Sequence, residues 1–255
     1  MQESTSCKNC QALTAGNYCS NCGQATDTHR LSAHYLWHDI QHHLLHFDKG
    51  VFYTIKELFT RPGYSIREYI EGKRIRHFRP ISLVILLATL YGILSLYFHT
   101  DVAGGIKYEF SENGAAAFQR LNEWASQHYV AYMMIALPFS ALGSFLAFRS
   151  QRYNFVEHFV MAAFLLGQAL VVMLLFFPLN YLLADSPLLK VMSTVVAFIG
   201  FGLNLWVNIQ FFDKLSRVKV FWLTLLSYLI MTVAMSVLSA GGTILYLVFT
   251  HLTKA

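Results

Sequence analysis

The sequence predicts an all-α integral membrane protein with about five transmembrane helices. Amphipathic juxtamembrane helices and a small N-terminal module built on four cysteines are expected to precede them. Hydrophobic residues make up 55% of the 255 residues and charged residues only 13%, about half the charged share of a typical soluble domain. Long stretches after residue 80 carry almost no charge, and two Cys-x-x-Cys motifs lie near the N-terminus. Together, these observations define the fold class.

Two Cys-x-x-Cys motifs within residues 1–26 predict a zinc ribbon with four cysteine ligands. Their members are Cys7, Cys10, Cys19 and Cys22. Four thiolates form a tetrahedral set without an open position, which suits a structural Zn²⁺ ion. So short a segment buries little core, and the metal would therefore supply most of its folding energy. A disulfide scaffold would need an export signal, which Met1–Gln24 lacks, and a redox dithiol would need only one motif.

Residues 27–80 are predicted to form amphipathic juxtamembrane helices. Between residues 29 and 47, apolar side chains gather on one face of a helical wheel and histidines on the opposite face. Further apolar-periodic stretches cover residues 51–59 and 64–71, with Gly72 as the stop after the second.

The histidine face raises the hypothesis of a second metal site. His38 and His42 lie one helical turn apart, and Asp39 could add an oxygen ligand. The alternative is a solvated polar face on an interfacial helix. Histidines at a strict spacing of four drift around the helix, so one ion could bind only two of them and would need a partner from elsewhere.

A run of basic residues precedes the first apolar segment. It contains Lys73, Arg74, Arg76 and Arg79. Such a run anchors a transmembrane helix on the cytosolic side and attracts anionic lipid headgroups. Nucleic acid is not an expected partner, because the run adjoins the bilayer and lacks interleaved aromatic residues on a sheet.

Five apolar segments within residues 81–255 approach or exceed the ~20 residues that cross the hydrocarbon core. They lie near residues 81–98, 129–148, 155–183, 189–212 and 220–249. The last would be ~45 Å long as a straight helix, against a core of ~30 Å. We therefore expect a break or kink at Ser239–Gly242. Pro138 and Pro178 are expected to kink the second and third spans.

The distribution of basic residues predicts the orientation. With five spans, fifteen of the nineteen Lys and Arg residues fall on the side of the N-terminus. The positive-inside rule then predicts insertion into a cytoplasmic (inner) membrane, with the N-terminus in the cytosol and the C-terminus outside. A cytosolic N-terminus also agrees with reduced thiols.

Polar residues within the spans are candidates for function, because their burial in lipid is costly. They are Glu157, His158, Gln168, Asn204 and Asn208. Glu157 could pair with Arg152 or with the basic run. Alternatively, Glu157 and His158 could handle protons or bind headgroups in an inner cavity. The three amides are expected to form interhelical hydrogen bonds.

The order of these motifs resembles a bacterial family of uncharacterised multi-pass membrane proteins. The motifs that carry the resemblance are the cysteine knuckles, His46-Phe47-Asp48-Lys49-Gly50, Arg61-Pro62-Gly63, the segment from Ile66 to Arg74, Pro80 and the segment from Tyr153 to His158. The family is grouped as a domain of unknown function. The resemblance implies an N-terminal zinc ribbon on a helical membrane domain, without an activity that could be transferred.

Three functions are compatible with these features. The first is a non-enzymatic inner-membrane module whose zinc ribbon and interfacial helices recruit a cytosolic or membrane protein partner or contact lipid. The second is a small transporter or lipid-moving protein, with the intramembrane polar residues converging around a cavity. The third is an interfacial metalloenzyme that uses the His-rich helix. Common catalytic motifs such as Gly-x-Ser-x-Gly and His-Glu-x-x-His are absent, and we therefore favour the first function.

Overall fold

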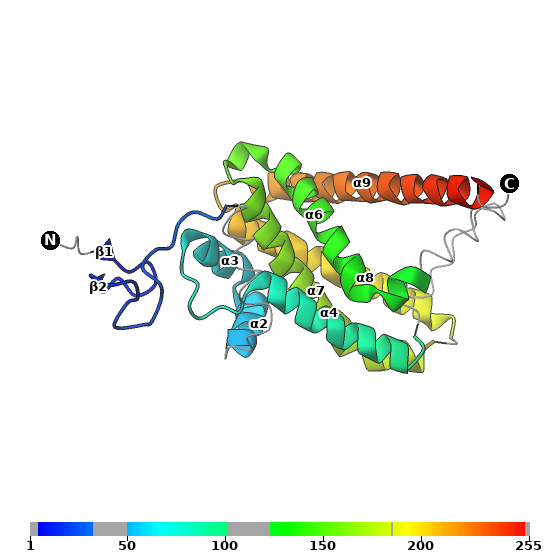
Figure 1. Cartoon of the computed structure of the whole chain (residues 1–255), viewed down its shortest axis with the longest axis horizontal. Helices are drawn as coiled ribbons and strands as arrows, with labels where there is room; N and C mark the ends of the chain where they lie inside the picture. The colour runs from blue at the N-terminus through cyan, green and yellow to red at the C-terminus, as the bar shows by residue number, and fades with distance from the viewer. Residues whose placement is uncertain (1–4, 33–49, 101–122, 185, 253–255) are drawn as a thin grey trace.

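A computed structural model describes residues 5–32, 50–100, 123–184 and 186–252 of the chain. The described chain is mostly helical, with five long apolar helices and a cluster of four cysteines at its N-terminal end (Figure 1). The predicted all-α membrane fold is thereby confirmed. The elements are β1 (Thr5–Ser6), β2 (Leu13–Thr14), α2 (Gly50–Thr60), α3 (Pro62–Glu71), α4 (Pro80–Tyr97), α6 (Tyr129–Ala147), η1 (Arg149–Gln151), α7 (Phe155–Leu182), α8 (Leu188–Phe211) and α9 (Arg217–Leu252).

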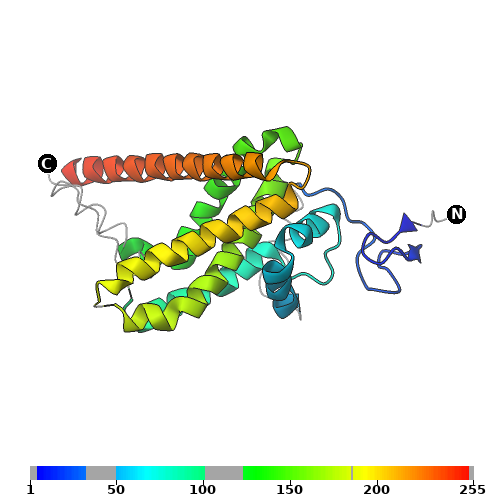
Figure 2. The ribbon, with the colours of Figure 1, turned by 180° about the vertical axis from the view of Figure 1, so that it is seen from behind.

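Helices α4, α6, α7, α8 and α9 are long and apolar enough to cross a membrane. Their ends fall within three residues of the segments expected from the sequence, because the charged and polar turns between them delimit the apolar runs. Successive spans run in opposite directions, so β1 and the C-terminal end of α9 lie at opposite ends of the bundle (Figure 2). We call the end that carries the four cysteines the module end.

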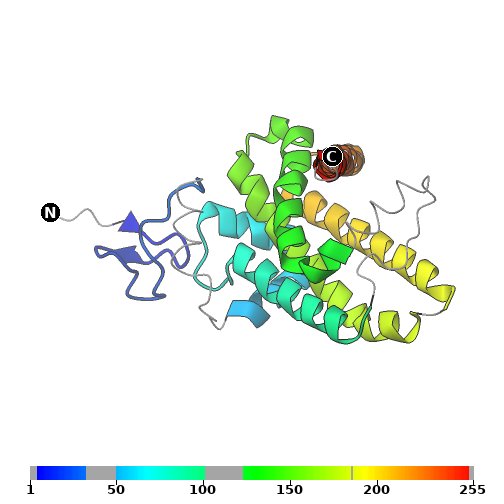
Figure 3. The same ribbon diagram turned by 45° about the vertical axis from the view of Figure 1, so that its right-hand side comes forward.

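Of the two expectations for the last span, a break or a kink, the break is wrong. Helix α9 continues without interruption from Arg217 to Leu252, through Ser239–Gly242. A break inside the hydrocarbon would leave backbone groups without hydrogen bonds, which costs more than keeping glycines in a helix. The helix lies at the edge of the bundle beside α6 (Figure 3). Helices α6 and α7 likewise continue through Pro138 and Pro178.

The core of the bundle lies between α4, α6 and α7, which pack against one another. In α4 and α7, half of the residues in the apolar 18-residue stretch that would cross the membrane are buried inside the protein. The corresponding share is 6% in α8 and 11% in α9. The exposed side chains of α8 and α9 are large and apolar; Phe198, for example, is 71% exposed. Such faces suit contact with lipid chains. Helices α8 and α9 therefore form the periphery of the bundle.

Helices α2 and α3 pack against the bundle at its module end. A Cβ atom on Gly63 would lie 2.4 Å from the Cβ of Gln210 and 2.5 Å from the amide nitrogen of Phe211, so only glycine permits this contact between α3 and α8. The guanidinium of Arg67 donates hydrogen bonds to the carbonyls of Gln210 and Phe211 and pairs with Asp213 at 2.7 Å. Arg67 thus satisfies carbonyls that the C-terminus of α8 leaves unpaired.

Candidate metal centre and its junction with the bundle

Four thiols gather in the segment that we call the cysteine module (residues 5–28). All four Sγ atoms lie within 4.8 Å of one another. The Sγ atoms of Cys7 and Cys22 are 3.6 Å apart, and those of Cys10 and Cys19 are 3.5 Å apart. A tetrahedral ion with metal–sulfur bonds of ~2.3 Å would separate the sulfurs by ~3.8 Å. The four cysteines are therefore close enough, and suitably arranged, to bind one metal ion.

The two knuckles repeat one backbone geometry. In each, the fourth residue after the first cysteine donates its N–H to that cysteine's carbonyl, at 2.9 Å for Gln11 and 2.8 Å for Gly23. Both residues are left-handed, with φ of 65° and 75°. Glycine tolerates this region, whereas glutamine rarely adopts it. The sequence therefore indicates only the second turn. The N–H of Ala12 lowers the pKa of Cys10 to about 6, whereas burial and the side chains of Cys10 and Cys22 keep the pKa of Cys19 above its usual range. The case for a metal therefore rests on the geometry of the four sulfurs.

Gln24 joins the cysteine module to the loop after α3, which we call the basic loop (residues 72–79). Its side-chain Nε2 donates to the carbonyl of Gly72 at 2.9 Å, and its Oε1 accepts from the backbone N–H groups of Arg74 and Ile75 at 2.9 and 3.2 Å. The Gln24 side chain is buried. Gly72 has φ of 114°, and a Cβ atom there would lie 2.8 Å from Lys8. The module therefore sits directly on the end of α3.

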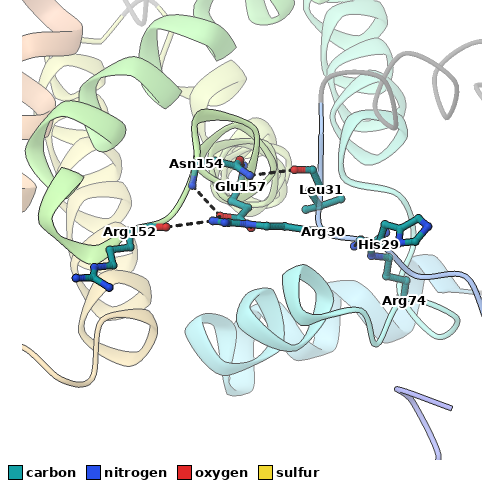
Figure 4. Close-up of polar contacts among 7 residues, drawn as sticks. All are labelled: His29, Arg30, Leu31, Arg74, Arg152, Asn154 and Glu157. Atoms are coloured by element: carbon teal, nitrogen blue, oxygen red, sulfur yellow. Dashed lines mark hydrogen bonds and ion pairs between the residues drawn. The ribbon is translucent and has the colours of Figure 1, made fainter. Parts of the chain in front are cut away.

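A bidentate ion pair holds the linker (residues 29–31) against α7 (Figure 4). The Nε and Nη2 atoms of Arg30 lie 2.7 and 2.8 Å from the two carboxylate oxygens of Glu157. The pair raises the pKa of Arg30 through its hydrogen bonds and its charge. Glu157 is 4% exposed and belongs to the capping box of α7: it accepts from the N–H of Asn154 at 2.7 Å, and the Asn154 side chain accepts from the Glu157 N–H at 2.8 Å. One carboxylate thus starts a helix and fixes the linker.

The neighbouring linker residues are held as well. The carbonyl of His29 accepts from Arg74 at 3.0 Å, and the carbonyl of Leu31 accepts from the side chain of Asn154 at 3.0 Å. Leu31 itself is buried. The predicted partner of Glu157 is corrected here: Arg152 contributes only its carbonyl, which accepts from Arg30 at 3.1 Å. Arg30 was missed because nothing in its local sequence points to a partner 127 residues away.

The other predicted polar residues occupy separate places. His158 Nδ1 lies 2.9 Å from Ser144 Oγ. The side chain of Gln168 donates to the carbonyl of Leu58 in α2 at 2.6 Å. The amide nitrogen of Asn208 lies 2.7 Å from Asn204 Oδ1 and 3.1 Å from Thr224 Oγ1, which links α8 to α9. Two of these contacts, Gln168 to Leu58 and Asn208 to Thr224, are the interhelical hydrogen bonds that amides were expected to form, whereas the contact between Asn208 and Asn204 lies within α8. Only Gln168 and Asn204 line a common cavity.

Side chains of the basic run are partly engaged within the protein. Lys73 pairs with Glu68 at 3.2 Å. The guanidinium of Arg74 donates to the carbonyl of Tyr69 at 3.1 Å and lies over the Tyr69 ring, 5.7 Å from its centroid. Arg76 is exposed and Arg79 half-buried. The residues of the proposed second metal site, His38, His42 and Asp39, lie outside the described residues, so that hypothesis stays a prediction.

His77 gives the junction a testable pH dependence. Its ring lies edge-on to those of Tyr53, Tyr69 and Phe164, with centroid distances of 5.3, 5.9 and 6.4 Å. Burial lowers the pKa of His77 to about 4; the charge of Glu68 opposes this shift, and that of Arg61 adds to it. Between pH 6.5 and about 4, the His77 side chain is protonated in the unfolded chain but neutral in the folded chain. His77 therefore costs no stability above pH 6.5.

As the pH falls from 6.5 through 4, we expect His77 to withdraw up to about 3 kcal/mol of stability. The measurement is the melting temperature of the detergent-solubilised protein at several pH values, for the wild type and for His77→Phe. The variant should lose less stability in acid than the wild type. Loss of the metal in acid affects both proteins, so parallel pH profiles would contradict the prediction.

A known family matches the part of the chain on which the cysteine module sits. Residues 48–92 match the model of a family described as "Protein of unknown function (DUF3667)". The matched stretch contains α2, α3, the basic loop and most of α4. The chain is thus similar to this family over the elements on which the cysteine module sits. Neither the curated proteins nor the solved structures give a match to the chain.

Proposed function

We propose that the protein is a non-enzymatic membrane module that presents a zinc-bound ribbon to a protein partner in the cytosol. The observation that carries the proposal is that the cysteine module is fixed to the bundle and yet exposes two large side chains. Gln24 and the linker attach the module, whereas its Leu13 is 74% and its Tyr18 70% exposed. Large apolar and aromatic side chains on an exposed surface are typical of protein-binding sites.

Zinc is the metal that the donor set favours. Four thiolates from two knuckles leave no open position, so the ion would organise the module and take no part in a reaction. Within the described module (residues 5–28), the buried apolar residues are Cys7 and Cys19, each 2% exposed. The module therefore has a very small apolar core. A structural Zn²⁺ ion would supply the stability that such a core lacks.

The fixed attachment of the module supports recruitment rather than a freely swinging tether. Residues 29, 30 and 31 each make a hydrogen bond or an ion pair to the bundle or the basic loop. The module would therefore offer Leu13 and Tyr18 in one orientation. A preorganised surface loses less conformational entropy when a partner binds.

The charge bias of the sequence supports an orientation in which the module end faces the cytosol and the C-terminus lies outside an inner membrane. Helices α2 and α3 would then lie at the level of the lipid headgroups. Phe52 on α2 is 86% exposed and Ile75 in the basic loop 46%, and the adjoining Arg76 is exposed. Apolar side chains beside an exposed cation suit contact with the interface of an anionic bilayer.

Proximity labelling tests this proposal. A biotin ligase is fused to the N-terminus of the full chain, in the wild type and in the double variant Leu13→Ser, Tyr18→Ser. Phe52→Ser is the matched control, because it also removes a large exposed side chain but leaves the module unchanged. We expect a reproducible set of cytosolic proteins to be labelled by the wild type and by the control, and to be lost in the double variant while its zinc content stays the same.

Two outcomes would overturn the proposal. Labelling that is the same for the wild type and for the Leu13→Ser, Tyr18→Ser variant would show that these two side chains recruit nothing. Labelling confined to proteins outside the cytosol would show that the orientation is wrong.

A further inference from the structure

A cavity of about 430 Å³ lies between the spans α6, α7, α8 and α9. Its size falls in the range of sites for small molecules. None of the residues that line it is Asp, Glu, Lys, Arg or His. The lining is mostly aliphatic, with a few polar side chains such as Gln168, Asn204 and Tyr228. The cavity therefore suits an uncharged, largely apolar occupant.

The cavity lies near the middle of the spans. Gln168 follows the start of α7 at Phe155 by ~20 Å along the helix, and Gly200 follows the start of α8 at Leu188 by ~18 Å, at 1.5 Å per residue. At that depth, the surroundings of the bundle are lipid chains rather than water or headgroups.

Water is a poor occupant of this cavity. An ordered buried water needs two to four polar partners. The amide nitrogen of Gln168 already donates to the carbonyl of Leu58 at 2.6 Å, and the amide oxygen of Asn204 accepts from Asn208 at 2.7 Å. One polar atom of each of these two amides is thus already engaged. The rest of the lining is mostly aliphatic, so hydrocarbon is the better match to the cavity.

The cavity lies beside the part of α8 and α9 where the two helices diverge. Helices α8 and α9 meet near the module end, where Asn208 bonds to Thr224, and they diverge toward the other end (Figure 2). Their rings Phe201 and Tyr228 both line the cavity, with centroids 5.5 Å apart. On the lipid-facing side of α8, Val195 is 47% exposed. Because this edge of the bundle faces lipid, it is the entry point that we assign to a chain from the bilayer.

We infer that this cavity is a binding site for one hydrocarbon chain of a membrane lipid, entered laterally between α8 and α9. The depth of the site, the absence of charge in its lining and its position at the lipid-facing edge of the bundle each favour an acyl chain over a soluble ligand. The inference is independent of the role of the cysteine module.

Two glycines on α8 supply a matched pair of variants. A Cβ atom at Gly200 or at Gly202 meets nothing within 4 Å, so both positions accept a larger side chain without a backbone clash. Gly200 lines the cavity, whereas Gly202 is not among the residues that line it. Gly200→Leu would fill the site, and Gly202→Leu makes the same change in the same helix outside it. Ala136→Leu, on α6, would fill the cavity from the opposite wall.

The full chain is placed in nanodiscs that contain a phospholipid with a diazirine near the middle of one acyl chain. After illumination, cross-linked residues are located by mass spectrometry. We expect labelling of cavity residues such as Ala162, which is 2% exposed, and Met231 in the wild type and in Gly202→Leu. In Gly200→Leu it should fall about tenfold, which corresponds to ~1.4 kcal/mol of steric conflict. Phe198 is the internal reference, because its exposed ring should be labelled in every variant.

Equal labelling of the cavity residues in the wild type and in Gly200→Leu would overturn the inference, and so would a cross-link between two copies of the chain at these residues. If Gly200→Leu does not fold, Ala136→Leu provides the same comparison. It should lower the labelling of Ala162 and leave that of Phe198 unchanged.

Discussion

Replacing Cys7 and Cys22 by serine is expected to remove one zinc ion per chain and to unfold the cysteine module while the helical bundle stays folded. Structural zinc contributes ~10–16 kcal/mol of apparent binding free energy in small zinc domains. The described part of the module has only two short strands, Thr5–Ser6 and Leu13–Thr14, and cannot replace that amount by burying side chains. The spans do not depend on the metal, because their core lies between α4, α6 and α7.

The measurement is metal content per chain on detergent-purified protein, together with limited proteolysis and circular dichroism. The variant should lose its zinc and become sensitive to protease before residue 32, with little change in helical signal. Ser20→Ala, an exposed change inside the second knuckle, should keep the metal. If one zinc ion survives in the double variant, the chain holds a second site, and His38, His42 and Asp39 become its leading candidates.

The spans were predictable from sequence because each property that defines them is local. A run such as Pro80–Tyr97 contains no charged residue, and a hydrocarbon core selects for that composition at every position. The stop after α3 was predictable for the same reason, since the left-handed turn at Gly72 has a glycine in the sequence. The cysteine cluster is likewise encoded in two short motifs.

The attachment of the module could not be predicted, because it depends on contacts between distant residues. Arg30 and Glu157 are 127 residues apart, and Gln24 and Gly72 are 48 residues apart. Neither arginine nor glutamine carries a local signature of its partner. The capping box from Asn154 to Glu157 is readable as a helix start, and it could have shown that Glu157 does more than pair with a neighbouring arginine.

Glu157→Ala is expected to destabilise the junction by about 2–4 kcal/mol, because it removes both the ion pair with Arg30 and the capping box of α7. Arg30→Gln should cost less, about 1 kcal/mol, since the Arg30 side chain is 62% exposed and the carboxylate keeps its bond to Asn154. The linker should loosen in both variants. Hydrogen exchange of residues 24–31 measures this directly, and thermal unfolding measures the total loss.

Arg152→Gln is the matched control, because Arg152 belongs to the same junction but contributes only its backbone carbonyl. It should leave the stability and the exchange of the linker unchanged. In a double-mutant cycle, Arg30→Gln should cost less in a Glu157→Gln background than alone, because the two side chains act as one unit. Additive losses would mean that the pair does not hold the linker. The cysteine module would then depend on Gln24 and Arg74 for its position, and a fixed orientation toward a partner would lose its main structural support.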